Sequence, residues 1–190
     1  MNPKATVIVI HGYQGHPDTG WKLWLKQELE KLSVQTFLPP MPTPNTPKED
    51  EWVATIAEQV KNASEPIILV GHSLGGSALL RYLEHKPEKQ ITGAIFLAAA
   101  VDFTTHADYP DVALFLKQPI DFDAIKKHSA QFLVINSTND DAIAPLEGEI
   151  LAKELNCRRL LLHNRGHFSA EEGTTEIPEL LKEIRELLSL

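Results

Sequence analysis

The sequence contains a single cysteine, Cys157, among its 190 residues. One thiol cannot form an intrachain disulfide, so the disulfide-stapled class of small secreted domains is excluded. Cys157 opens a strand-like run, where a thiol usually serves as a small apolar filler of the core. We therefore expect a structural cysteine and a reducing, cytoplasmic compartment.

Long apolar runs and an excess of basic residues are also missing. The first apolar run, Ala5–Ile10, is far too short for a signal sequence or a membrane span. The formal net charge is -8, and no basic stripe offsets it. We therefore expect neither nucleic acid nor a membrane as a partner.

Motifs of nucleotide-binding and zinc-dependent proteins are absent as well. Neither G-x-G-x-x-G nor G-x-x-x-x-G-K-[ST] follows a strand-like run, and no H-E-x-x-H occurs. His11, His16, His163 and His167 could in principle bind a metal ion, but they lack the close spacing of ligand pairs. We expect no cofactor and no metal.

The chain does contain a glycine-flanked serine between two contrasting patterns. The β-branched run Ile67–Val70 predicts a buried strand, and helical spacing of apolar residues starts at Leu74. Between them lies Gly71-x-Ser73-x-Gly75. This spacing is typical of a nucleophile elbow, in which glycines let strand and helix approach and the serine Oγ is exposed at the helix N-terminus.

Apolar runs and helical periodicity alternate along the rest of the chain. This alternation predicts one α/β domain over residues 1–190 with a six-stranded, mostly parallel sheet between helical layers. The predicted strands are 5–10, 34–38, 67–70, 93–100, 132–136 and 158–163. The predicted helices are 19–32, a segment from 47 through 60, one from 74 to the proline at 87, then 111–117, 122–128, 146–155 and 175–189. Thr46 and Glu49 predict a capping box at the start of the second helix.

A serine nucleophile needs a base and a group that orients that base. Asp140 and Asp141 follow the fifth predicted strand, and His167 follows the sixth, so all three lie at the edge where Ser73 lies. Their order, Ser then Asp then His, is that of α/β-hydrolases. Spacing alone does not choose between the two aspartates.

These residues together resemble the α/β-hydrolase superfamily, and within it the small cap-less serine hydrolases of the retinoblastoma-binding-protein-nine type. The resemblance runs nearly end to end. It is carried by His11-Gly12-Tyr13, Trp21 and Trp24, Met41-Pro42, Trp52, Gly71-His72-Ser73-Leu74-Gly75, Asp140-Asp141 with Pro145, and Gly166-His167-Phe168.

The resemblance implies further features of the fold and the site. It implies the strand order 2-1-3-4-5-6, with Ser73 at the switch point of the sheet. It implies that the triad acid lies four positions before Pro145, which selects Asp141 over Asp140. It also implies an oxyanion hole formed by the backbone N–H groups of Tyr13 and Leu74.

The expected function is hydrolysis of small ester, thioester or amide substrates through an acyl-enzyme on Ser73, His167 and Asp141. The alternative is an interaction module that keeps the fold with little turnover. The segment 101–128 mixes aromatic residues with aspartates, and we expect it either to form an ordinary crossover connection or to cover an acyl pocket that prefers short chains and disfavours anions. The aromatic residues expected in this cover are Phe103, Tyr109, Phe115 and Phe122.

Overall fold

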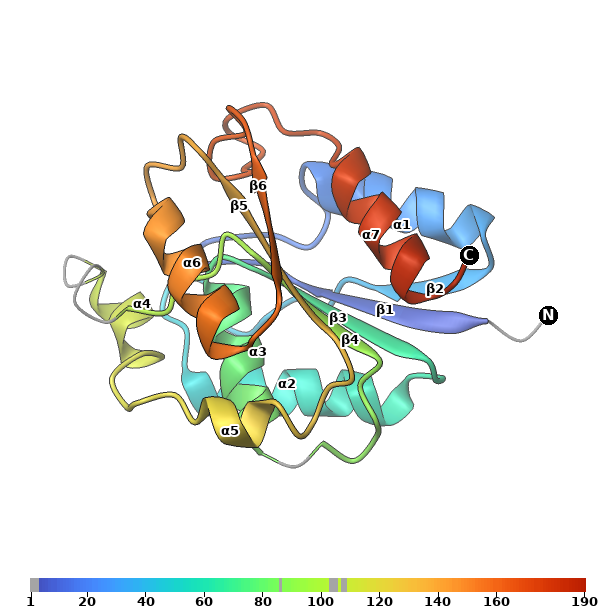
Figure 1. Cartoon of the computed structure of the whole chain (residues 1–190), viewed down its shortest axis with the longest axis horizontal. Helices are drawn as coiled ribbons and strands as arrows, with labels where there is room; N and C mark the ends of the chain where they lie inside the picture. Colours follow the sequence, from blue (N-terminus) through green and yellow to red (C-terminus); the bar gives the residue numbers. More distant parts are fainter. Residues whose placement is uncertain (1–3, 86, 103–105, 107–108) are drawn as a thin grey trace.

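The computed structural model describes residues 4–85, 87–102, 106 and 109–190 of the chain. These residues form a six-stranded sheet with helices on both faces (Figure 1). The strands are all parallel and lie in the order β2-β1-β3-β4-β5-β6. The expected architecture and strand order are confirmed.

The helices and strands follow the predicted segments closely. The strands are β1 Ala5–Ile10, β2 Val34–Phe37, β3 Ile67–His72, β4 Gly93–Leu97, β5 Phe132–Ser137 and β6 Arg158–Leu162. The helices are α1 Trp21–Lys31, α2 Glu49–Asn62, α3 Leu74–Glu84, α4 Pro110–Leu114, α5 Phe122–Ile125, α6 Pro145–Glu154 and α7 Pro178–Leu187.

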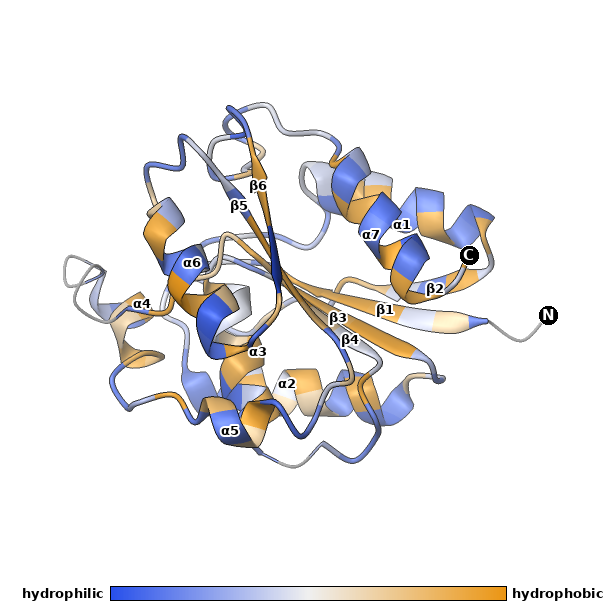
Figure 2. Cartoon of the chain, viewed as in Figure 1, coloured by the Kyte–Doolittle hydropathy of each residue, from blue (hydrophilic) through white to orange (hydrophobic). Residues whose placement is uncertain are grey.

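The central strands are buried on both faces, as their uninterrupted apolar sequences require. In β1, Ile8 and Ile10 pack with α2 and α3, whereas Val7 and Val9 pack with α1 and α7 on the opposite face. Successive side chains of a strand point to opposite faces, so this alternation divides the core into two layers. Figure 2 shows that the central strands are largely hydrophobic, whereas the helices around them carry both hydrophobic and hydrophilic residues.

Two local predictions about element boundaries are wrong. The apolar run from Gly93 continues to Ala100, but β4 ends at Leu97 because Ala98 has a positive φ of 46° and leaves the extended conformation. The predicted capping box does not form, since α2 starts at Glu49 without a side-chain cap. Thr46 instead closes a turn in which its backbone N–H donates to the carbonyl of Thr43.

The parallel sheet brings four loops to one edge. The segments that follow β1, β3, β5 and β6 all leave the carboxyl ends of their strands, where α/β folds place their sites. These segments carry Gly12 and Tyr13, Ser73, the two aspartates and His167. Within the part of the chain that the structure describes, no helix has the length and apolar character needed to span a membrane.

Candidate active site

Ser73 is the single residue between β3 and α3. Its backbone has φ 54° and ψ -125°, a conformation that side-chain-bearing residues rarely adopt. Its backbone N–H donates to the carbonyl of Leu97 at 3.0 Å, which ties the turn to the neighbouring strand β4. Strain of this kind costs on the order of 1–3 kcal/mol and persists only where surrounding structure enforces it. The predicted strand, sharp turn and helix are confirmed.

Glycine is required on both sides of this turn. A Cβ at Gly71 would lie 2.6 Å from the carbonyl oxygen of Gly75, and a Cβ at Gly75 would lie 2.4 Å from the carbonyl oxygen of Ile10. To relieve such an overlap with backbone atoms, a whole strand or helix would have to move. The elbow glycines therefore set how closely α3 approaches β3 and β1.

The loop after β1 lies directly against the serine. A Cβ at Gly12 would lie 2.8 Å from the Cβ of Ser73 and 3.3 Å from its Oγ. The backbone N–H groups of Tyr13 and Leu74 donate to no acceptor among the described residues. They are therefore available to a ligand, which is what an oxyanion hole requires.

The side chain of His11 holds this loop in place. The N–H of Met41 donates to its Nε2 at 3.1 Å, so the proton is on Nδ1, which donates to the carbonyl of Gly12 at 2.9 Å. Burial lowers the pKa of His11, which favours this neutral form. His11 thus serves as a support for the loop and has no lone pair left for a base.

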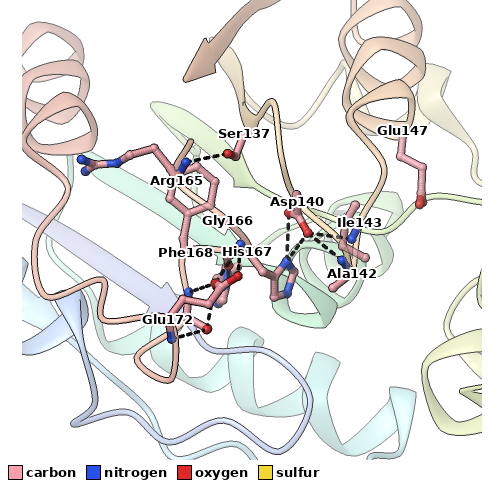
Figure 3. A network of polar contacts seen from close by, with 12 residues as sticks. Ser137, Asp140, Ala142, Ile143, Glu147, Arg165, Gly166, His167, Phe168 and Glu172 are labelled. Carbon is pink, nitrogen blue, oxygen red and sulfur yellow. Dashed lines mark hydrogen bonds and ion pairs between the residues drawn. The ribbon is translucent and has the colours of Figure 1, made fainter. Parts of the chain in front are cut away.

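His167 contacts Asp140, which corrects the choice of Asp141. The Nδ1 of His167 lies 2.9 Å from Oδ2 and 3.1 Å from Oδ1 of Asp140 (Figure 3). The Asp140 side chain is 1% exposed, whereas Asp141 is exposed to solvent. The N–H groups of Ala142 and Ile143 donate to Oδ1 of Asp140 at 2.9 and 2.8 Å. Asp140 is therefore fixed in a local turn with its second oxygen directed at the imidazole.

The backbone of the His167 loop is fastened by residues that sequence analysis did not assign to the site. The carboxylate of Glu172 accepts from the N–H of His167 at 2.8 Å and from the N–H of Ser169 at 3.1 Å (Figure 3). Partial burial acts to raise the pKa of Glu172, but these hydrogen bonds hold it below its ordinary value. The indole N–H of Trp21 donates to the carbonyl of Phe168 at 3.0 Å.

His72, next to the nucleophile, also supports His167. Its Nε2–H donates to the carbonyl of His167 at 2.8 Å, and the two rings lie 5.0 Å apart between centroids. Burial, with His167 acting in the same direction, lowers the pKa of His72 well below its ordinary value. A neutral His72 can hold this bond without placing a second positive charge beside a protonated His167.

A cavity of about 350 Å³ contains both Ser73 and His167. Among the described residues, Ser73 Oγ makes no hydrogen bond to the ring of His167, and such bonds often tighten only when substrate is present. A second cavity of about 490 Å³ is lined in part by Gly166 and Glu172, and it contains neither Ser73 nor His167. The residues lining the cavity of Ser73 are Gly12, Tyr13, Gln14, Gly15, His16, Thr19, Lys22, His72, Ser73, His167, Phe168, Ser169, Ala170 and Glu171.

The expected cover from residues 101–128 does not reach this cavity, since none of its described residues lines it. Phe115 is fully buried against Trp52, with ring centroids 5.7 Å apart. Tyr109 is 59% exposed, and Phe122 packs against the core. Phe103 lies outside the described residues. The aromatic residues of this segment that are described therefore fill the core or face solvent.

Comparisons with known proteins identify the family of the chain. A family model described as serine hydrolase matches residues 7–186. The chain belongs to the serine hydrolase family. It is an enzyme of the serine hydrolase type, and its expected kinship within the α/β-hydrolases is confirmed.

Individual relatives of this serine hydrolase span almost its whole length. It is 31% identical over 174 residues to YdeN of Bacillus subtilis, covering 90% of each chain. It is 25% identical over 187 residues to Serine hydrolase RBBP9 of Rattus norvegicus, covering 98% of this chain and 96% of the relative. The crystal structure of the B. subtilis ydeN gene product superposes with a TM-score of 0.90 at 28% identity, covering 98% and 100% of the two chains. Est1E of Butyrivibrio proteoclasticus has a TM-score of 0.79 at 16% identity, covering 100% of this chain and 90% of that one, and so shares the fold.

Proposed function

We propose that this serine hydrolase cleaves small ester, thioester or amide substrates through an acyl-enzyme formed on Ser73. The observation that carries the proposal is that Ser73 and His167 open into one cavity while the buried Asp140 binds the far nitrogen of His167. Nucleophile, base and orienting acid are the three roles that acyl transfer requires. The expected partner is a small-molecule acyl substrate.

In the first half-reaction, Nε2 of His167 accepts the proton of Ser73 as Oγ attacks the acyl carbon. The Asp140 carboxylate accepts from Nδ1–H, which keeps the lone pair of the ring on Nε2 and stabilises the imidazolium that forms. The electron pair of the carbonyl moves to its oxygen, and the N–H groups of Tyr13 and Leu74 stabilise that charge.

The intermediate then collapses in a second proton transfer. The bond to the leaving group breaks, and the leaving group takes the proton from Nε2 of His167. Water attacks the acyl-Ser73 ester with His167 again as base, which releases the acid and returns Ser73 to its hydroxyl form.

Labelling with a fluorophosphonate tests the nucleophile. We expect the probe to modify Ser73 alone, because the elbow places Ser73 in a cavity together with a neighbouring base. Peptide mapping by mass spectrometry identifies the modified residue. Labelling that persists in Ser73→Ala would contradict the assignment, and absence of labelling in the wild type would favour an interaction module with little turnover.

Acyl-chain length provides a second prediction. A cavity of about 350 Å³ is at the small end of the range for ligand pockets, about 300–1,000 Å³. We therefore expect kcat/KM to fall from butyryl to octanoyl to palmitoyl esters, by about 1 kcal/mol or more for each misfitting methylene. A series of p-nitrophenyl esters measures this. A steady rise toward palmitoyl would show that the chain lies outside the cavity.

A further inference from the structure

Lys22 contributes an unusual positive charge to the cavity of Ser73. It is the second residue of α1 and is only 6% exposed. Apart from histidines, the lining contains one other ionisable charge, that of the exposed Glu171. Lysine is rarely so buried unless its ammonium group is paired. The position therefore needs an explanation beyond helix packing.

The ammonium group of Lys22 has no strong partner in the described part of the chain. Nζ donates to the hydroxyl of Thr19 at 3.3 Å and lies 5.5 Å from the ring centroid of Trp21. Among the described residues, no carboxylate oxygen lies within 4.0 Å of Nζ. By contrast, Lys26, one turn further along α1, pairs with Glu30 at 3.7 Å and is partly exposed. An ammonium group has three donors, so Lys22 retains binding capacity.

This charge acts on histidines of the candidate active site. The positive charge of Lys22 helps to lower the pKa of both His11 and His72, the histidines beside Gly12 and Ser73, although burial is the larger cause for each. Burial lowers the pKa of Lys22 itself, and Glu171 acts more weakly in the opposite direction. A buried cation in the cavity of the nucleophile destabilises the free protein and becomes favourable once an anion is bound.

We propose that Lys22 binds a carboxylate of the substrate. The preferred substrates are then small acyl compounds that carry one carboxylate in addition to the ester, thioester or amide bond that is cleaved. This inference rests on the proposed function and names its substrate class. A monoanion fits better than a phosphate dianion because the cavity offers one ammonium group and also contains Glu171. The described aspartates of 101–128, which were expected to repel anions, do not line the cavity.

The experiment compares matched substrates that differ only in charge. Monomethyl glutarate and methyl 4-carbamoylbutanoate place a carboxylate or a carboxamide on the acyl side. The pair 3-acetoxypropanoate and 3-acetoxypropanamide does the same on the alcohol side. Product formation followed by NMR gives kcat/KM for each. We expect a preference of about tenfold or more for the carboxylate in at least one pair, which also shows on which side the anion binds.

Variants assign the preference to the ammonium group. Lys22→Met keeps the length of the side chain and is expected to reduce the ratio of carboxylate to carboxamide kcat/KM by about tenfold. Because it removes a poorly paired buried charge, this variant should melt no lower than the wild type. Lys26→Met is the matched control on the same helix and should leave the ratio unchanged. Glu171→Gln removes the competing anion of the lining and should increase the ratio.

The outcomes separate this inference from the proposed function. If a fluorophosphonate labels Ser73 and the carboxamide esters have the same kcat/KM as the matched carboxylates, the inference is overturned and the serine mechanism stands. A carboxylate preference that is unchanged in Lys22→Met also overturns it, whatever the effect of Glu171→Gln. If Ser73 is not labelled and no ester is hydrolysed, the proposed function fails and the inference with it.

Discussion

Replacing Asp140 with asparagine is expected to lower turnover of ester substrates on the order of 10⁴-fold. The substitution keeps the size of the side chain but exchanges one acceptor oxygen for an amide donor. The effect therefore reports on the proton of His167 and not on packing. Initial rates with p-nitrophenyl acetate, corrected for the folded fraction, measure it.

The structure determines which oxygen of Asp140 is replaced by the amide nitrogen. Oδ1 accepts from the N–H groups of Ala142 and Ile143, so an asparagine must keep its carbonyl oxygen there. The NH₂ group then occupies the place of Oδ2, 2.9 Å from Nδ1 of His167. An amide donor at that place requires an unprotonated Nδ1, which puts the proton on Nε2. Nε2 can then no longer accept the proton of Ser73.

Asp141→Asn is the matched control, one residue away and with the same change of charge. Asp141 is exposed, and among the described residues its carboxylate makes no hydrogen bond or ion pair with His167. We expect its turnover to stay within about twofold of the wild type, since surface substitutions usually change little. The assignment fails if Asp141→Asn is the inactive variant, or if both variants keep their activity.

The choice between the two aspartates shows where sequence analysis reaches its limit. Both follow β5 in the same loop, and either could accept backbone hydrogen bonds from the residues that follow it. Adjacent side chains leave a turn in different directions, so a shift of one residue separates a buried carboxylate from an exposed one. The number of residues between the aspartate and Pro145, taken from the family resemblance, therefore does not determine which carboxylate reaches His167.

The sheet was predictable because its signals are local and redundant. The apolar runs that became β1 and β3 are uninterrupted, short and rich in β-branched residues, which favours strands buried on both faces. Ser73 was equally predictable. Any protein with this turn needs glycine at the flanking positions, because a Cβ there would overlap neighbouring backbone atoms. The positions of Ser73 and His167 at one edge then followed from the parallel topology.

The segment 101–128 and Lys22 depended on tertiary contacts that composition does not encode. An aromatic residue fits a core as well as a pocket, and Phe115 packs against Trp52, which is far away in the sequence. Lys22 follows Trp21 in an amphipathic helix, where a lysine normally faces solvent. The loop that carries His167 is bonded to the start of α1 through Trp21 and Phe168, and it lines the same cavity as Lys22.

Gly75→Ala is expected to lower the free energy of unfolding by about 3 kcal/mol and kcat/KM by about 100-fold or more. The new Cβ would lie 2.4 Å from the carbonyl oxygen of Ile10 and 2.6 Å from that of His11. Both are backbone atoms at the end of β1, so relief requires α3 to move away from the strand. Alanine is the better helix former by about 1 kcal/mol, which is too little to offset this overlap.

The loss of activity in Gly75→Ala has a separate cause from the loss of stability. Moving α3 shifts Ser73 and the N–H of Leu74 relative to the loop of Gly12 and Tyr13, and displacements of about 1 Å can cost on the order of 100-fold in rate. We therefore expect a folded fraction, isolated below its melting temperature, to remain slow. Urea unfolding monitored by circular dichroism and rates on the same sample measure the two effects.

Gly173→Ala is the control for adding a methyl group where there is room. A Cβ there would meet nothing within 4 Å, although the φ of +79° adds strain. We expect a loss of about 1–2 kcal/mol in unfolding free energy from that strain, with little change in rate. Gly75→Ala with wild-type kcat/KM would contradict the argument, because it would mean that the contact between α3 and the end of β1 does not set the position of the nucleophile.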